Sequence, residues 1–454
     1  MAQHKKKPGG HKIEAVAKAH HKNVFLQKLK HFVNTCCDED IFSLIPPRFQ
    51  EAIYILRCHS LTLVKASDNP MPDRLLNNQR HILSVWLKKD PLELSKYNQT
   101  LSLDDFLTVG LTALHLNLII SENSFPKAAR VTAALFNYCN DNEPYVLLCR
   151  QLYSAFEAMS WYISNLGAHL YWLNYEMKLA GNGKLGVNNI VEIHRITPES
   201  IRIKINGITR PAIRLCWAHP FDGLKWTTLK PSLLGIKKPL TDEPLPVYVQ
   251  SHVLRRLVER IDSLMPSIAQ FNMIISFNDP KVFYDCNQNL MIEYRIFGTK
   301  AGYFRIDIIK GLVVVRTFLF LTHTSTPEGQ LLWKNTGLQK LDKKYLAIDK
   351  LSSFMSSDIG ENEIIRKIFT NSGCNSLLEL YERHKNLCIK HAHQQTCKLI
   401  IDYLGNNLSK FPEEIFDHEL QMLNQEPLSD TGYDSPDSEE ALVNDLQVLS
   451  HYPL

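Results

Sequence analysis

One segment of the chain combines side chains that can hold a phosphate group with one that can move a proton. It contains His252, Arg255, Arg256, Glu259 and Arg260. On a helix these residues fall at positions i, i+3, i+4, i+7 and i+8, and therefore share roughly one face. Guanidinium groups grip phosphate oxygens, and an imidazole exchanges protons near neutral pH. This spacing predicts a helix that can bind and cleave a phosphodiester without a metal ion.

The elements around this helix must supply a surface for it to rest on. The helix is expected over Tyr248–Asp262, where Leu254, Leu257, Val258 and Ile261 form an apolar face that suits a sheet. An apolar period of two then predicts four strands, Lys281–Asp285, Leu290–Phe297, Tyr303–Ile309 and Leu312–Thr322. Charged or polar positions fall on or just after these strands: Glu293, Arg295, Arg305, Asp307, Arg316, Thr317 and His323.

The same segment has a purely structural interpretation. Arginine and glutamate four residues apart commonly form the solvated face of a surface helix. In that case His252 is an incidental residue of the first turn. The residue types alone leave both interpretations open.

Residues 247–323 resemble the compact metal-independent ribonucleases of the barnase, EndoU, colicin-nuclease and RelE group. Two features carry the resemblance. One is a Ser-His-x3-Arg-x3-Arg helix formed by Ser251, His252, Arg256 and Arg260, and the other is a strand that ends in Val-Val-Val-Arg-Thr, Val313–Thr317. The long helical flanks of this chain are not part of that group's minimal fold.

The resemblance also implies roles for individual residues. His252 would be the acid or base of the reaction, and Arg256 and Arg305 would clamp the phosphate. Arg316 and Thr317 would position the substrate at the end of the sheet. No spacing fixes a second histidine, and His323 is the one candidate for it.

The periodicity of the whole chain predicts an α+β fold. A helical domain is expected over residues 23–183, including a long helix from about Asp141 toward Leu179. An α+β domain is expected over 187–323, with a mostly antiparallel sheet and the His/Arg helix. Its first strands are Val191–Ile196, Ser200–Asn206 and Ile208–Trp217, the last two joined by a tight turn. A helical region over 334–410 follows, with helices at Lys340–Met355, Glu361–Asn371 and Ser376–Leu404.

Charge is distributed unevenly along the chain. Residues 1–22 carry six lysines and one glutamate, whereas residues 411–454 carry eleven acidic residues and no lysine or arginine. Because the net charge of the chain is +4, the body between these ends carries +10. A basic body with an acidic tail favours contact with RNA or another polyanion, although solvated surfaces also drift in charge. Residues 1–22 and 424–454 hold too little apolar surface to offset the entropy of ordering, and disorder is expected there.

The cysteines and the long uncharged windows bear on compartment and membrane. Ten scattered cysteines, behind a polar start without a secretory leader, indicate reduced thiols and a cytoplasmic location. Phe106–Ser121 is short for a membrane span and Ala158–Tyr175 is rich in polar side chains. Both windows are expected to be buried helices, with no membrane contact.

A second cluster has the residue types of a metal site. His384, Cys388 and His391 fall at i, i+4 and i+7, a spacing that can chelate a metal, and His393 and Cys397 follow. His393 lies on another side of such a helix, and no Cys-x2-Cys pair elsewhere completes a site. Phosphate-loop, Rossmann and His-Glu-x2-His patterns are also missing from the sequence. No metal and no cofactor are expected.

Two functions from different classes remain open at this stage. The first is a metal-independent endoribonuclease module that uses His252 as acid or base and arginines as phosphate clamps. The second is a non-enzymatic protein that binds nucleic acid through its basic body, or a protein partner through its helical regions. Convergence of His252, Arg256, Arg305 and Arg316 in one cleft would favour the first.

Overall fold

The chain forms two compact units. Unit 1 comprises Met1–Glu157 and Leu173–Arg195, and unit 2 comprises Ala158–Trp172 and Ile196–Leu454. The computed structural model describes residues 9–67, 69–181, 185–205, 207–220, 223–236, 241–285, 287–355, 359, 362–384 and 397–405. These units do not follow the predicted order of domains along the chain, because the chain passes into unit 2, returns to unit 1, and passes into unit 2 again.

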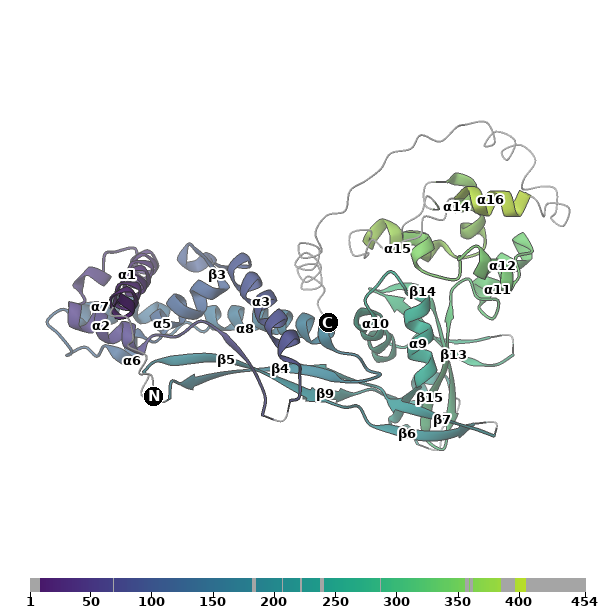
Figure 1. Ribbon diagram of the computed structural model, residues 1–454, viewed down its shortest axis with the longest axis horizontal. Helices are drawn as coiled ribbons and strands as arrows, with labels where there is room; N and C mark the ends of the chain where they lie inside the picture. Colours follow the sequence, from purple (N-terminus) through teal and green to yellow (C-terminus); the bar gives the residue numbers. More distant parts are fainter. Residues whose placement is uncertain are drawn as a thin grey trace, which may run out of the picture. The chain divides into compact units, whose positions relative to one another are not determined.

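Unit 1 is built mainly of helices. The longer ones are α1 (Gly9–Cys37), α2 (Pro47–Leu56), α3 (Asp73–Lys89), α7 (Ala128–Cys139) and most of α8 (Glu143–Ile163) (Figure 1). Short helical turns are η1 (Phe42–Leu44), η2 (Ser95–Tyr97), α4 (Leu103–Asp105), η3 (Phe106–Gly110), α5 (Leu111–Leu114) and α6 (Leu116–Ile119). A three-stranded sheet has the order β1-β5-β4, from β1 (Thr62–Lys65), β5 (Val187–Ile196) and β4 (Leu170–Leu179), and β2 (Pro91–Leu94) pairs with β3 (Gln99–Ser102).

Two expectations for this part of the chain were wrong. Residues 9–22 belong to α1 instead of a disordered tail, since alanine and lysine favour helix and the helix continues into a packed segment. The long helix expected to reach Leu179 ends at Ile163, and Leu170–Leu179 forms β4. Aromatic residues there, such as Tyr171 and Trp172, favour a strand, and Gly167 lies in the loop between the two elements.

Unit 2 is organised around an eight-stranded sheet. The main path is β12-β13-β14-β15-β11-β7-β6, and β10 pairs with β11. The strands are β6 (Ser200–Ile205), β7 (Ile208–Arg214), β10 (Thr228–Leu229), β11 (Leu245–Gln250), β12 (Val282–Tyr284), β13 (Leu290–Ile296), β14 (Thr299–Ile309) and β15 (Leu312–Phe320). A separate hairpin is formed by β8 (Cys216–His219) and β9 (Gly223–Trp226), followed by the turn η4 (Pro231–Leu234). Among the described strands of the sheet, β11 and β15 are the parallel pair and the rest are antiparallel.

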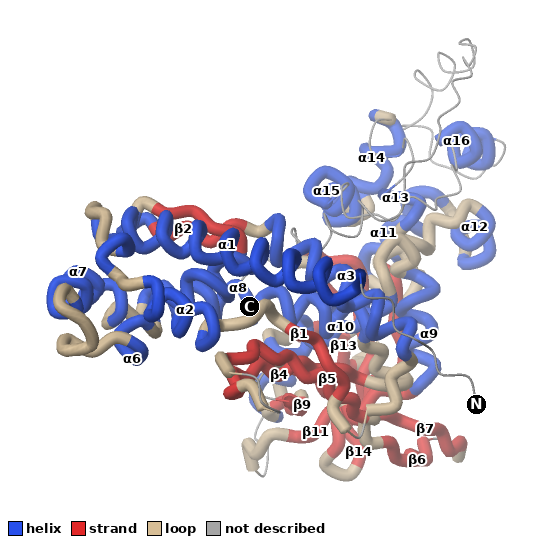
Figure 2. The backbone as a smooth tube through the Cα atoms, turned by 60° about the vertical axis from the view of Figure 1, so that its left-hand side comes forward, coloured by secondary structure: helices blue, strands red, loops and turns tan. Residues whose placement is uncertain are grey.

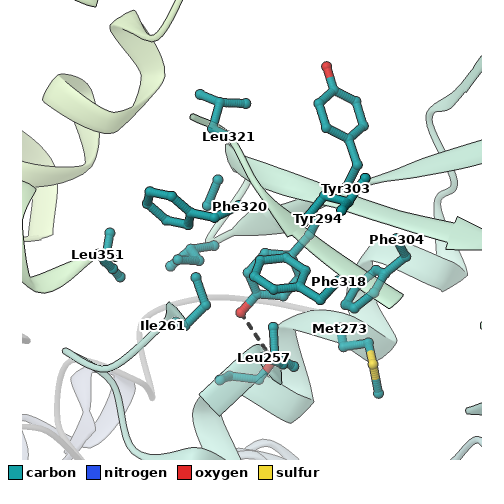
Figure 3. Close-up of a cluster of buried hydrophobic side chains, with 14 of the residues drawn as sticks. Leu257, Ile261, Met273, Tyr294, Tyr303, Phe304, Phe318, Phe320, Leu321 and Leu351 are labelled. Atoms are coloured by element: carbon teal, nitrogen blue, oxygen red, sulfur yellow. Dashed lines mark hydrogen bonds between the residues drawn. The ribbon is translucent and has the colours of Figure 1, made fainter. Parts of the chain in front are cut away.

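Two helices lie against this sheet. The helix α9 (Ser251–Arg260) follows β11 directly and contacts β15, while α10 (Pro266–Asn278) contacts β13 and the flank of α9 (Figure 1). Their apolar side chains join those of the strands in one core. Figure 3 shows Leu257 of α9, and Ile261 just after the helix, pointing into this core beside Phe318 and Phe320 of β15. The Tyr294 hydroxyl donates to the carbonyl of Ala269 in α10 at 3.1 Å, which links the second helix to β13.

The last described helices form one group, which Figure 2 shows together. They are α11 (Pro327–Thr336), α12 (Lys340–Tyr345), α13 (Ser352–Met355), α14 (Glu363–Asn371), α15 (Asn375–His384) and α16 (Cys397–Gly405). Leu332, Phe354, Ile365 and Leu377 are buried in the same core as the sheet. The predicted disorder of residues 424–454 lies outside the described residues.

The α+β class, with helical regions on either side of a mostly antiparallel sheet, is confirmed. Strand β6 ends at Ile205 and β7 begins at Ile208, which pairs with it, as expected for strands joined by a tight turn. The predicted start of the His/Arg helix was wrong, because Tyr248, Val249 and Gln250 form the end of β11 and the helix begins at Ser251. Helices α10 and α11 were not anticipated. In the described part of the chain, no helix is long and apolar enough to cross a membrane.

Candidate anion-binding cleft

The strand β11 determines where α9 begins. Val247 and Val249 lie beside Val313 and Val315 of β15, and all four side chains are buried. The helix starts one residue after this strand ends, so its first turn lies beside Arg316. There β15 carries a bulge, since Arg305 of β14 pairs with Thr317 and the next residue pairs with Val315. The start of the His/Arg helix is thereby fixed against an irregular point of the sheet.

The sequence of α9 separates two faces. Val253, Leu254 and Leu257 are buried in the core, while Arg255 and Glu259 are exposed. Burial of the leucine and valine side chains is worth about 1.5–3 kcal/mol each, which holds the helix in a single orientation. The charged residues must then face away from the sheet.

A cleft lies between α9 and α12, with the end of β15 between them. Its volume is about 470 Å³. We call it the basic cleft, and it is lined by Arg255, Arg256, Glu259, Arg260, Phe318, Phe320, Thr322, His323, Thr324, Lys340, Leu341, Lys343, Lys344 and Asp349. Six of these side chains are lysine or arginine and two are acidic. The cleft therefore has a strong excess of positive charge.

The two carboxylates of the cleft are already paired. Asp349 forms an ion pair with Arg260, and Glu259 lies 3.5 Å from the Nε atom of Arg255. In the described part of the chain no carboxylate lies within salt-bridge distance of Arg256, Lys340 or Lys344. These three cations are left to attract an external anion.

A second cavity lies at the other end of α9. It has a volume of about 560 Å³ and is lined by Arg210, Pro211, Ser251, His252, Arg255 and Arg256. We call it the histidine cavity. Arg255 and Arg256 line both spaces, so cationic side chains occur along α9 from Arg210 to the lysines of α12, and we call this set the cationic track.

Burial and the nearby cations both affect the pKa of His252. Burial lowers the pKa of this imidazole, and the charges of Arg210, Arg256 and Arg255 lower it further. A hydrogen bond to the backbone of Arg316 acts in the opposite direction. The imidazole is therefore neutral near pH 7 and is oriented by β15. Such a ring can accept a proton, and an anion bound beside it would favour its charged form.

His323 lines the basic cleft, and its pKa is also lowered. Burial, followed by the charges of Lys340, Lys343, Arg260 and Arg256, lowers its pKa to about 4. Its Nδ1 atom accepts a hydrogen bond from the backbone N–H of Ser325 at 3.1 Å, so the neutral ring carries its proton on Nε2. His323 is thus a neutral donor at neutral pH.

Lys343 has a structural part in this arrangement. Its side chain is buried, and its ammonium group donates to the carbonyls of Thr322 and Gly329, each at 2.9 Å. Burial lowers its pKa to about 8. A Cβ atom on Gly329 would collide with the carbonyl of His323. This tight packing fixes the turn after β15 and, with it, the position of His323.

The structure brings together some of the predicted site residues. His252 and Arg256 line the same cavity, and Arg256 donates to the Thr317 hydroxyl at 2.9 Å. Arg316 reaches the site through its backbone, whereas its guanidinium pairs with Asp307. Arg305 donates to the side-chain oxygen of Asn289 at 2.5 Å and lines neither cavity. The four side chains whose convergence would favour an enzyme, His252, Arg256, Arg305 and Arg316, do not all line one cavity.

Other residues of the track were missed. Arg210 has no pattern around it that singles it out, because it reaches the cavity only through pairing of β7 with β11. The run Lys340–Lys344, with three lysines at the start of an expected helix, was a usable signal. Among the described residues, no three His, Cys, Asp or Glu side chains gather into a group that could hold a metal ion. The His/Cys cluster around residues 384–397 lies largely outside the described residues.

Comparison with known proteins adds no relative. No protein-family model, no curated protein and no solved structure matches this chain.

Proposed function

We propose that the exposed face of α9 in unit 2 binds the phosphate backbone of RNA. The observation that carries this proposal is that two cavities share Arg255 and Arg256 and together form one cationic track. A single small anion would need one of these cavities. A chain of phosphates can occupy both at once.

The length of the track fits several phosphates. From His252 to Arg260 the helix rises about 12 Å, at 1.5 Å per residue. Phosphates of one stacked nucleic-acid strand follow each other at about 3.4 Å along the axis, so α9 spans roughly three to four of them. Arg256 and Arg255 lie in the middle of this span and can address phosphates on either side.

The test is binding of a labelled single-stranded RNA, measured by fluorescence anisotropy over a series of salt concentrations. Replacing both Arg255 and Arg256 by alanine should weaken binding and reduce the salt slope by about 0.7 for each lost phosphate contact. The matched control is Arg366→Ala, an exposed arginine of α14 that pairs with Glu382. Equal affinity and equal slope for the double variant and the control would refute the proposal.

Cleavage of that RNA is a second candidate function, favoured by one specific observation. His252 lines the histidine cavity with three arginines, and the backbone of Arg316 orients its ring. In this reaction the neutral imidazole takes the proton of a ribose 2′-hydroxyl. The 2′-oxygen then bonds to phosphorus, the P–O5′ bond breaks, and the departing oxygen takes a proton from water. Arginines beside the phosphate would stabilise the added negative charge.

A further inference from the structure

The short helix α12 buries a lysine and exposes a leucine. Lys343 is 2% exposed, whereas Leu341 is 78% exposed and lines the basic cleft. Tyr345, one turn further along, is 62% exposed. Exposed apolar side chains beside a charged cleft are the usual mark of a surface that a partner covers.

The spacing on α12 sets two rows side by side. Lys340 and Lys344 form one i, i+4 row, and Leu341 and Tyr345 form the next. The lysines and Leu341 line the basic cleft, and Tyr345 follows Leu341 by one turn on the same helix. A ligand that follows the lysines therefore passes beside Leu341, and Tyr345 extends the apolar row beyond it.

The ring of Tyr345 packs against that of Tyr403. Its ring lies 5.6 Å from that of Tyr403 in α16, and the Tyr403 hydroxyl donates to a carboxylate oxygen of Asp342 at 2.7 Å. Asp342 also accepts from the backbone N–H of Gln339 at 2.7 Å, within the capping box of α12. The second ring is thus tied to the helix that carries the first, which limits the motion of Tyr345.

We infer that this strip receives unpaired bases, so that the ligand of the basic cleft is single-stranded RNA. This inference rests on the proposed function. Cations and aromatic side chains in alternation are what proteins use to bind single strands, because each base has a face that can stack. A duplex hides its base faces, and a polyphosphate has none. Neither of these ligands would gain from Leu341 or Tyr345.

The experiment compares four ligands of similar length on the full chain. They are a single-stranded RNA of about ten nucleotides with 2-aminopurine at its centre, its duplex, an abasic oligonucleotide and inorganic polyphosphate. Tyr345→Ala should weaken binding of the single strand by about 5- to 100-fold and remove the quenching of 2-aminopurine. Tyr345→Phe should retain both, and polyphosphate should bind all variants alike. Trp333→Ala, an exposed aromatic of α11, is the control.

The possible results separate the two levels of the proposal. If the abasic oligonucleotide or the duplex binds as tightly as the single strand, and Tyr345→Ala changes nothing, this inference is overturned while RNA-backbone binding stands. If none of the four ligands binds, or if replacing Arg255 and Arg256 by alanine leaves the affinity unchanged, the proposed function fails. This inference then fails with it.

Discussion

The helices α9 and α10 lie side by side on one sheet, yet polar side chains are mostly buried in α10 and mostly exposed in α9. In α10 the polar side chains of Gln270, Asn272 and Ser276 are buried, and each is hydrogen-bonded to the backbone. Asn272 accepts from the N–H of Phe297 at 2.8 Å, and Gln270 accepts from that of Leu166 at 2.8 Å. In α9 the polar face is turned outward, and Arg256 has a hydroxyl as its protein partner but no carboxylate.

This difference follows from what each helix covers. The largely buried helix α10 packs on β13, so its buried polar groups must be hydrogen-bonded within the protein. The helix α9 covers the end of β15, beyond the point where β11 stops pairing with that strand. One side of α9 remains open, and the open side is where cations collect. If the proposed function holds, α10 serves stability and α9 serves binding.

The largest effect expected is on chemistry at α9. His252→Ala should lower the rate of RNA cleavage by about 10²–10⁴, the contribution of one acid–base group. Binding should survive, since the arginines remain. Rates of the variant, the wild type and the surface control His81→Ala would be measured in EDTA. A wild-type protein that binds RNA but does not cleave it from about pH 5 to 8, with or without metal, would leave binding as the function of the track.

A change in α10 should affect stability instead. Phe271 is buried, with its ring stacked on that of Trp161 at 3.6 Å. Phe271→Ala should lower the free energy of unfolding by about 3–5 kcal/mol, through lost burial and the cavity left behind. Urea unfolding measures this loss, with the exposed Leu331→Ala as control. RNA affinity of the folded variant should be unchanged, and a large loss of affinity at low urea would contradict the division between the two helices.

The pH dependence of stability should reflect the lowered pKa of His323, which burial and then the nearby cations cause. Its folded pKa is about 4 and its unfolded value about 6.5, so between these values the unfolded chain binds more protons. The free energy of unfolding should therefore fall as pH drops through this window, by up to about 3 kcal/mol. Urea unfolding of His323→Gln should show a weaker dependence. Equal slopes for both proteins would show that burial and the nearby cations do not lower the pKa of this residue on folding.

The smallest effect is expected from the acidic tail. Residues 424–454 are acidic, and a polyanion that belongs to the chain should compete with RNA for the face of α9. Deleting them should raise RNA affinity several-fold at low salt, with the difference vanishing as salt screens the charges. Anisotropy titrations at two salt concentrations would measure it. Unchanged affinity at low salt would remove the competition.

Much of the fold was readable from the sequence. Alternating apolar residues located β6, β7, β13, β14 and β15 to within a few residues, because a half-buried strand must alternate. The cationic face of α9 was readable for the same reason, since Leu254 and Leu257 identify the buried side and the arginines follow on the other. The charge of the tails follows from composition alone, and the fold class follows from the period of the apolar residues.

Tertiary structure decided the rest. The residues Tyr248–Gln250 look helical by their neighbours but extend β11, which pairs with β7 and β15. Helix α10 lacks the polar face that a period of 3.6 requires. Arg210, Lys340 and Lys344 lie far from α9 in the chain, and only sheet pairing and helix packing bring them to it. Arg305 lies on β14 opposite Thr317 of β15, yet its side chain bonds to Asn289. Local sequence fixes which side of an element is polar, whereas long-range packing fixes which polar sides meet.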